Sequence, residues 1–154
     1  MNINDACDYI IVKVKESGSS LNLLKLQKLL YYAQAWHLAI HGTPLFNGKF
    51  QAWVHGPVSR EIYDRFASSK TLYSEVTSQD IRNEFNLDDV SELDSGHLND
   101  VLEAYAQFRG SQLEALTHSE EPWKEARQGY RPSERCEREI SETTMQRYYA
   151  ARLQ

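Results

Sequence analysis

The chain has few of the residues that build covalently or metal-stabilised scaffolds. Only two cysteines occur among its 154 residues, Cys7 and Cys136, and they lie far apart in the sequence. They can form neither a disulfide framework nor a paired-cysteine zinc knuckle. This cysteine usage is typical of a reducing compartment, so we expect a cytoplasmic protein.

Long apolar runs are also missing. No stretch approaches the ~20 consecutive apolar residues of a membrane-spanning helix. Residues 1–5 (MNIND) show neither the basic patch nor the apolar segment of a secretory signal. We therefore expect a chain that stays where it is made and has no membrane partner.

Positive charge is scarce too, since the formal net charge is -5. Nucleic-acid binding needs a cationic face that releases counterions, so we do not expect a nucleic-acid partner. The negative charge is concentrated between Glu75 and Glu103, where nine acids face the single base Arg82. This acidic stretch either forms a solvated face or attracts a basic partner.

Catalytic motifs with a fixed spacing are absent: the chain has no GxSxG, no glycine-rich phosphate loop, no CxxC and no HExxH. His37 and His41 stand four residues apart, but no third metal ligand accompanies them, and we expect a pair at a helix end. His118 and Glu120 precede a helix, where such residues commonly cap it. We expect no enzyme, no metal and no cofactor.

Helical periodicity is what the chain has in abundance. Its 41% hydrophobic and 25% charged residues are ordinary for a globular protein, and its length suits one domain over 1–154. Between 22 and 41, apolar residues recur every three or four positions before Gly42 and Pro44, which predicts a long central helix. Shorter helices are predicted at 5–16, after Pro57, at 98–108, between 111 and 127, and from Ser141 onward.

A small β-hairpin is predicted at about 45–54. Asn47-Gly48 is the favoured two-residue turn, and the residues of 50–54 alternate as in a half-buried strand. Residues 68–95 are polar and weakly periodic, which indicates a loop with short helical pieces. The expected fold class is therefore mainly α, a compact multi-helix domain around the helix at about 22–41 with one small hairpin.

Adjacent tyrosines occur twice, at Tyr31-Tyr32 and Tyr148-Tyr149. Neighbouring residues on a helix do not share a face, so we expect one ring of each pair to be partly exposed. Exposed aromatic rings suit the anchor positions of a protein interface, although such rings also commonly border a core.

Several sequence blocks follow one another in order over nearly the whole chain. They are LKLQKLLYYAQAW (24–36), PLF (44–46), AW (52–53), HGPV (55–58), IY (62–63), TH (117–118), PW (122–123), Met145 and YY (148–149). The ordered set resembles the SocA-like antitoxin domain, also called Panacea, which GepA-type phage-associated proteins share. The motif positions that carry over are Lys25, Gln27, Lys28, Tyr31, Tyr32, Trp36, Trp53, His55, Gly56, Pro57, Tyr63, His118, Glu120, Pro122 and Trp123.

The resemblance implies an antitoxin of a bacterial or prophage toxin–antitoxin system, which neutralises a cognate toxin protein by direct contact. We expect a rigid groove or face, rimmed by exposed aromatic side chains and the acidic stretch. A proteolytic adaptor that delivers the toxin to a protease is one alternative, a small enzyme using His118 and Glu120 is another, and homodimer formation stays open. The candidate partner-binding residues are Lys25, Lys28, Tyr32, Trp53, His55, Tyr63, His118, Glu120 and Trp123.

Overall fold

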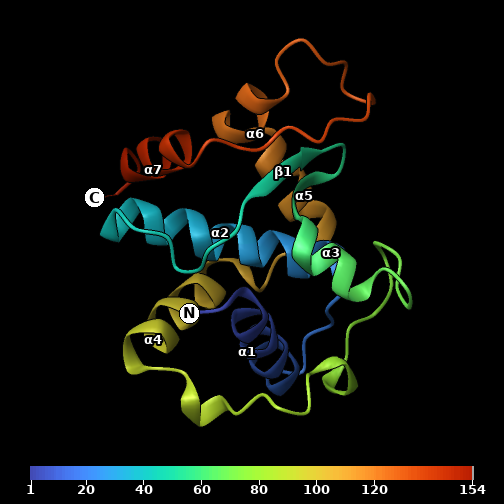
Figure 1. The fold of residues 1–154 in the computed structure, drawn as a ribbon, viewed down its shortest axis with the longest axis vertical. Helices are drawn as coiled ribbons and strands as arrows, with labels where there is room; N and C mark the ends of the chain where they lie inside the picture. The colour runs from blue at the N-terminus through green and yellow to red at the C-terminus, as the bar shows by residue number, and fades with distance from the viewer. Residues whose placement is uncertain (154) are drawn as a thin grey trace.

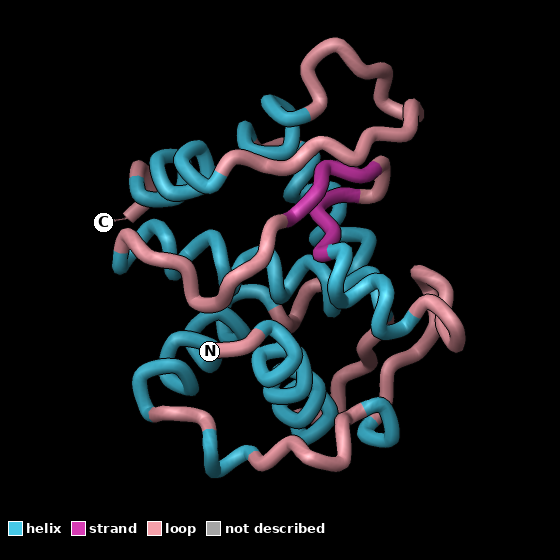
Figure 2. Tube along the Cα trace, in the orientation of Figure 1, coloured by secondary structure: helices cyan, strands magenta, loops and turns pink. Residues whose placement is uncertain are grey.

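The computed structural model describes residues 1–153 of the chain, and this part is mainly helical (Figures 1 and 2). The helices are α1 (Ile3–Glu16), α2 (Leu23–His41), α3 (Arg60–Phe66), α4 (Glu92–Tyr105), α5 (Gly110–His118), α6 (Glu121–Ala126) and α7 (Glu142–Ala150). The strands β1 (Phe50–Trp53) and β2 (Gly56–Ser59) form one antiparallel hairpin. The predicted fold class is thus confirmed.

Helix α2 runs through the middle of the molecule, and α1, α4, α5, α7 and β2 all pack against it (Figure 1). Its N-terminus is capped by the Asn22 side chain, which accepts a hydrogen bond from the Lys25 N–H at 2.8 Å. Gly42 ends the helix in a left-handed conformation that costs glycine little. The predicted central helix is confirmed almost to the residue.

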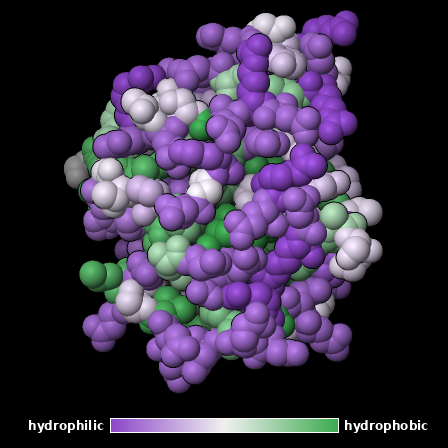
Figure 3. All heavy atoms as spheres, viewed as in Figure 1, coloured by the Kyte–Doolittle hydropathy of each residue, from purple (hydrophilic) through white to green (hydrophobic). Residues whose placement is uncertain are grey.

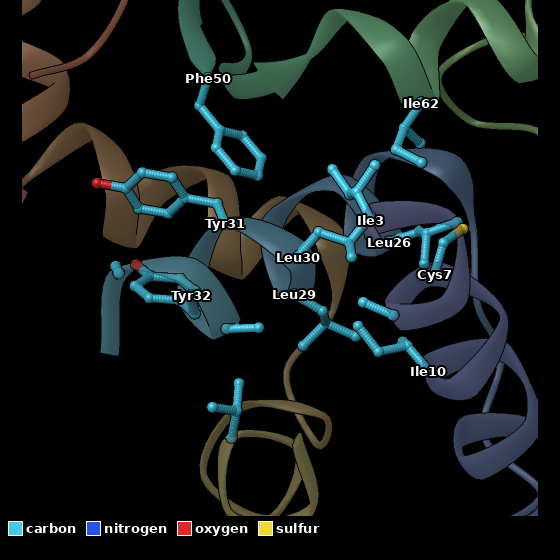
Figure 4. Close-up of a cluster of buried hydrophobic side chains, with 14 of the residues drawn as sticks. Ile3, Cys7, Ile10, Leu26, Leu29, Leu30, Tyr31, Tyr32, Phe50 and Ile62 are labelled. Carbon is cyan, nitrogen blue, oxygen red and sulfur yellow. The ribbon is translucent and has the colours of Figure 1, made fainter. Parts of the chain in front are cut away.

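The hydrophobic core lies on both sides of α2. Figure 4 shows Leu26 and Leu29 turned toward Cys7 and Ile10 of α1, and Tyr31 toward Phe50 of β1. Each large apolar side chain that is buried this way contributes about 1.5–3 kcal/mol relative to exposure. No helix within residues 1–153 has the length and apolar character needed to cross a membrane.

The two tyrosine pairs behave differently from each other. Tyr31 and Tyr32 are 1% and 0% exposed, so the expectation that one of them reaches solvent is wrong. Because elements surround α2 on several sides, one ring packs edge-on against Phe50 while the other stacks on Tyr105 of α4. In the second pair Tyr149 is buried and its neighbour Tyr148 is half-exposed, as predicted.

A small hairpin is present, but the bounds predicted for it, 45–54, are wrong. Residues 45 and 46 pair with a side chain rather than a strand, because the Gln34 amide accepts from the Leu45 N–H at 2.8 Å and donates to the Phe46 carbonyl at 2.7 Å. Asn47-Gly48 consequently precedes the hairpin, and Val54-His55 forms the turn between β1 and β2.

Pro57 lies inside β2 instead of opening a helix. It pairs with Ala52, next to the Trp53–Gly56 pair that flanks the two-residue turn. Hydrogen-bonded and non-hydrogen-bonded pairs alternate in an antiparallel ladder, so this position does not need the N–H that proline lacks. The Ala52 N–H points the other way and donates to the Arg138 carbonyl at 2.8 Å.

The predicted loop agrees with the structure, whereas several predicted helix ends differ from it by a few residues. Residues 68–91 form a loop with two short 3-10 helices, η1 (Ser78–Asp80) and η2 (Leu87–Asp89), as predicted. Helix α4 begins at Glu92 rather than at 98 and ends at Tyr105 rather than at 108. Helix α5 begins at Gly110 rather than at 111. The Ser141 cap of α7 is confirmed by its hydrogen bond from Thr144.

A buried carboxylate ties α1 to α3 and the loop after η1. Asp8 is fully buried and accepts from Arg65 at 2.5 Å and from Arg82 at 2.6 Å. Because it holds two guanidinium groups, this side chain is a cross-link between three distant parts of the chain.

Candidate protein-interaction site

A cavity of about 610 Å³ lies beside the hairpin, and we call it the hairpin groove. Its walls are the hairpin with its turn, helix α3 with residues 67–72, and the segment 135–137. Leu23, Val58 and Leu72 contribute apolar surface to its lining. On the face shown in Figure 3, hydrophobic residues form separate patches on a largely hydrophilic surface.

Two aromatic rings meet in the groove. Trp53 of β1 and Tyr63 of α3 pack edge to face with ring centroids 4.9 Å apart. The indole N–H of Trp53 donates to the Gln51 side chain at 2.7 Å, which fixes the orientation of the ring. The Arg60 guanidinium lies 5.8 Å and 5.6 Å from the two ring centroids, within the range of a cation–π interaction.

The third wall of the groove is held against the free edge of β1. Ile140 donates to the Phe50 carbonyl at 2.7 Å, so the segment before it runs along the strand. The buried Arg127 donates to the Ala52 carbonyl at 2.8 Å and to the carbonyls of Arg131 and Glu134. The loop that carries residues 135–137 therefore has fixed backbone anchors.

The turn of the hairpin rests on a layer of buried polar groups. Lys28 of α2 is fully buried below it, and its Nζ donates to the Pro57 carbonyl at 3.1 Å. Burial lowers the pKa of Lys28 from 10.5 to about 7, because removing the ammonium from water disfavours its charged form. A Cβ at Gly56 would lie 2.5 Å from the Lys28 Cε, so only glycine allows this approach.

His118 and Trp123 complete the same layer. The two rings stack with centroids 4.0 Å apart, and the Trp123 indole donates to the Trp53 carbonyl at 2.9 Å. His118 Nε2 is buried without a hydrogen-bond partner among residues 1–153, and burial lowers the pKa of this imidazole. These side chains hold the hairpin turn from below, while His55 at the turn is exposed and lies 3.1 Å from Glu114.

Glu120 belongs to a separate cluster between α2 and α7. One of its carboxylate oxygens accepts from Tyr32 at 2.7 Å and from Tyr149 at 2.8 Å. Burial raises the pKa of Glu120, while the two hydroxyl donors partly offset that rise. Glu120 thus hydrogen-bonds to two tyrosines, whereas His118 stacks on Trp123, so the two residues have different partners.

The nine candidate residues fall into distinct places. Trp53, His55 and Tyr63 line the hairpin groove. The other six are buried or half-buried and make contacts within the chain. They are Lys25, whose Nζ donates to the Ala106 carbonyl at 2.5 Å, together with Lys28, Tyr32, His118, Glu120 and Trp123.

The candidate residues chosen from the sequence did not include the charged residues of the groove, namely Arg60, Lys70, Arg135 and Glu137. They lie in segments with no recognisable motif, and only the fold brings residue 60 within 2.9 Å of residue 137. The acidic stretch expected at the rim contributes none of the lining residues. Among its members, Asp80 instead forms an ion pair with Lys70 at 3.2 Å.

The histidine pair on α2 gains a third member from α4. The rings of His37 and His41 lie 4.6 Å apart by their centroids, and the His97 ring lies 5.0 Å from the first of them. His97 Nε2 is 2.8 Å from the Ala33 carbonyl and so is engaged with the backbone. Within the described residues no set of histidine, cysteine or acidic side chains is arranged to hold a metal ion.

Comparison with known proteins identifies the family of the chain. Antitoxin SocA of Caulobacter vibrioides (strain NA1000 / CB15N) is 34% identical over 110 residues, which are 65% of this chain and 56% of that protein. The chain thus spans little more than half the length of this curated relative. No solved structure matches it. The family model for the "Antitoxin SocA-like, Panacea domain" matches residues 26–124, which include most of α2, the hairpin, α3, α4 and α5. The chain therefore belongs to the SocA-like, Panacea-domain family.

Proposed function

We propose that the protein is an antitoxin that neutralises a cognate toxin by binding it directly, and that the hairpin groove with its rim is the contact surface. The observation that carries the proposal is the convergence of Trp53, His55 and Tyr63, three family-motif residues, on one groove in which the rings of Trp53 and Tyr63 pack together.

The groove has the properties of an interface centre. Tryptophan, tyrosine and arginine are the residues that most often dominate binding energy, and all three line it. Its third wall is fixed by hydrogen bonds to the backbone of β1, so little conformational entropy of this segment is lost when a partner is bound. A typical interface takes about 800 Å² from each partner, roughly a tenth of the 8078 Å² surface of this chain.

Binding rather than catalysis is the action that this arrangement supports. Lys28 and Trp123 donate hydrogen bonds to the backbone of the hairpin, and the half-buried His118 stacks on Trp123. Glu120 accepts hydrogen bonds from two tyrosines. In the proposal these groups position the contact surface and do not meet a substrate.

The test is co-expression of the chain with the product of the adjacent gene in a bacterial host. Growth should be rescued and the two proteins should co-purify, and Trp53→Ala together with Tyr63→Ala should weaken both effects. Phe108→Ala is the matched control, because this ring is 36% exposed against 38% for Tyr63 and lies outside the groove. Absence of rescue and of a complex with the unaltered chain would refute the proposal.

The same cells separate blockade from delivery to a protease. If the toxin is blocked by binding, its abundance during rescue stays level in immunoblots. A fall in toxin abundance that disappears in a protease-deficient host would instead indicate the adaptor role.

A further inference from the structure

Basic side chains gather in the lining of the hairpin groove, and nearby carboxylates pair with them. The lining includes the bases Arg60, Lys70 and Arg135 and the acid Glu137. Lys70 is paired with Asp80 at 3.2 Å, and Arg60 is paired with Asp64 at 3.3 Å as well as with Glu137. The guanidinium groups of Arg60 and Arg135 are therefore the cationic groups that a carboxylate of a partner can meet here.

Two arginines already hold a carboxylate at this rim. Glu137 Oε1 accepts from Arg60 Nη1 at 2.9 Å and from Arg135 Nη2 at 3.3 Å, so one carboxylate oxygen bridges guanidinium groups from α3 and from the third wall. All three side chains are well exposed. Exposed ion pairs are weak, because water and salt screen them, and an incoming carboxylate can take the place of Glu137.

Apolar surface lies next to this pair of arginines. Arg60 itself packs over the rings of Trp53 and Tyr63, and Val58 and Leu72 line the same cavity. A volume of about 610 Å³ accommodates a large side chain and adjoining backbone. The site thus combines a carboxylate seat with an aromatic and aliphatic pocket a few ångströms away.

We propose that the hairpin groove receives a segment of the partner protein in which a large apolar side chain adjoins an aspartate or glutamate. The apolar side chain packs against Trp53 and Tyr63, and the carboxylate displaces Glu137 from between Arg60 and Arg135. The inference rests on the proposed function, since it names the chemistry of the toxin segment that is bound.

The third wall lies outside the part of the chain that the family model matches, residues 26–124. Two walls of the groove are thus built from the family domain, while Arg135 and Glu137 come from the segment that follows it. In the proposal this segment sets the preference of this particular chain for an acidic partner.

The first experiment measures the dissociation constant of the complex by titration calorimetry, using the full chain and the adjacent-gene product recovered from the co-purified complex. Arg135→Glu should raise the constant at least tenfold, since it places a negative charge where the partner's carboxylate binds. Arg131→Glu is the matched control, because it makes the same charge change at an arginine on the same loop that is 84% exposed against 83% for Arg135, and it should stay within twofold of the original value.

Glu137→Gln provides a change in the opposite direction. It removes the internal carboxylate while keeping the size of the side chain, so it should lower the dissociation constant about threefold. Raising the salt concentration should weaken the complex of the unaltered chain more than that of Arg135→Glu. Equal dissociation constants for the unaltered chain, Arg135→Glu and Glu137→Gln would overturn the inference.

A second experiment identifies the partner's side of the contact. Random variants of the toxin gene are selected for restored growth with Arg135→Glu, and each is checked for toxicity on its own. The expected suppressors replace an acidic residue with lysine or arginine next to a large apolar residue, and suppressors at other kinds of position only would contradict the inference. If the unaltered chain binds no adjacent-gene product, the proposed function fails as well. If it binds but tolerates Arg135→Glu, only the present inference fails.

Discussion

Replacing Lys28 by methionine should stabilise the protein, and the gain should depend on pH. The ammonium group of Lys28 is 0% exposed beneath the hairpin turn and has one acceptor, the Pro57 carbonyl at 3.1 Å. Burial lowers its pKa from 10.5 to about 7. Methionine keeps an unbranched side chain that fills the same space without a charge.

The direction of the pH dependence follows from proton binding by the folded and unfolded states. Between pH 7 and 10.5 the unfolded chain keeps the Lys28 proton while the folded protein loses it, so folding becomes more favourable as pH rises. The slope is at most about 1.4 kcal/mol per pH unit, and the whole interval corresponds to an upper bound of about 5 kcal/mol. Below pH 7 both states are protonated and the destabilisation is complete. Lys28→Met removes this destabilisation, while loss of the hydrogen bond to Pro57 reduces the gain in stability by about 1 kcal/mol.

The assay is urea unfolding of the original protein and Lys28→Met, followed by circular dichroism at pH 6, 7, 8, 9 and 9.5. The quantity to compare is the difference in unfolding free energy, because burial also raises the pKa values of Tyr31 and Cys7 in both proteins and these effects cancel. The difference should be largest at pH 6–7 and shrink toward pH 9.5. Lys124→Met, at an exposed lysine of α6, should show no such trend. A pH-independent difference for Lys28→Met would refute the reasoning.

Three further changes test other buried features. Glu120→Gln should be at least as stable as the original above pH 7. Burial raises the pKa of Glu120, so the original protein loses stability as rising pH ionises this carboxyl group in the folded state. Thermal melts from pH 4 to 8 measure this difference. Gly56→Ala should cost about 2 kcal/mol or more in urea unfolding, since φ is +106° and the new methyl group would overlap the neighbouring lysine. Asp8→Ala should cost about 3–5 kcal/mol in the same assay, because it leaves Arg65 and Arg82 without their shared carboxylate.

Each of these changes has a control or a contradicting result. For Gly56→Ala the control is Gly96→Ala on α4, where a Cβ meets nothing within 4 Å and alanine should add about 0.5–1 kcal/mol. For Glu120→Gln, an unchanged stability profile from pH 4 to 8 would show that the carboxylate is not destabilised by burial. For Asp8→Ala, a loss below 1 kcal/mol would show that the two arginines find other partners at no cost.

Local sequence patterns predicted the helices well because helix formation depends on neighbouring residues. The three- and four-residue spacing between 22 and 41, followed by Gly42 and Pro44, was sufficient to place α2. The Ser141 cap placed α7 for the same reason. The hairpin was predicted too early in the chain because Asn47-Gly48 is a strong turn sequence. Residues 45 and 46 do not form a strand before that turn, because their backbone groups hydrogen-bond to the side chain of Gln34 on α2.

In the candidate site too, some residues were predicted from the sequence and others were placed only by the fold. Trp53, His55 and Tyr63 are recognisable from motif blocks, and they do line one groove. The burial of Tyr32, Lys28 and Glu120 could not be anticipated, because it depends on how many elements surround α2 rather than on the residues beside them in the chain.

The amino-acid sequence by itself determined the helical class, the position and ends of the central helix, and the family, because these follow from composition, spacing and ordered motifs. The tertiary structure alone decided which side chains are exposed, how the hairpin pairs, and that Arg60, Arg135 and Glu137 meet at one rim. The physical reason is that exposure and charge proximity are set by contacts between segments far apart in the sequence, such as Arg60 and Glu137, which are 77 residues apart, and no local pattern encodes them.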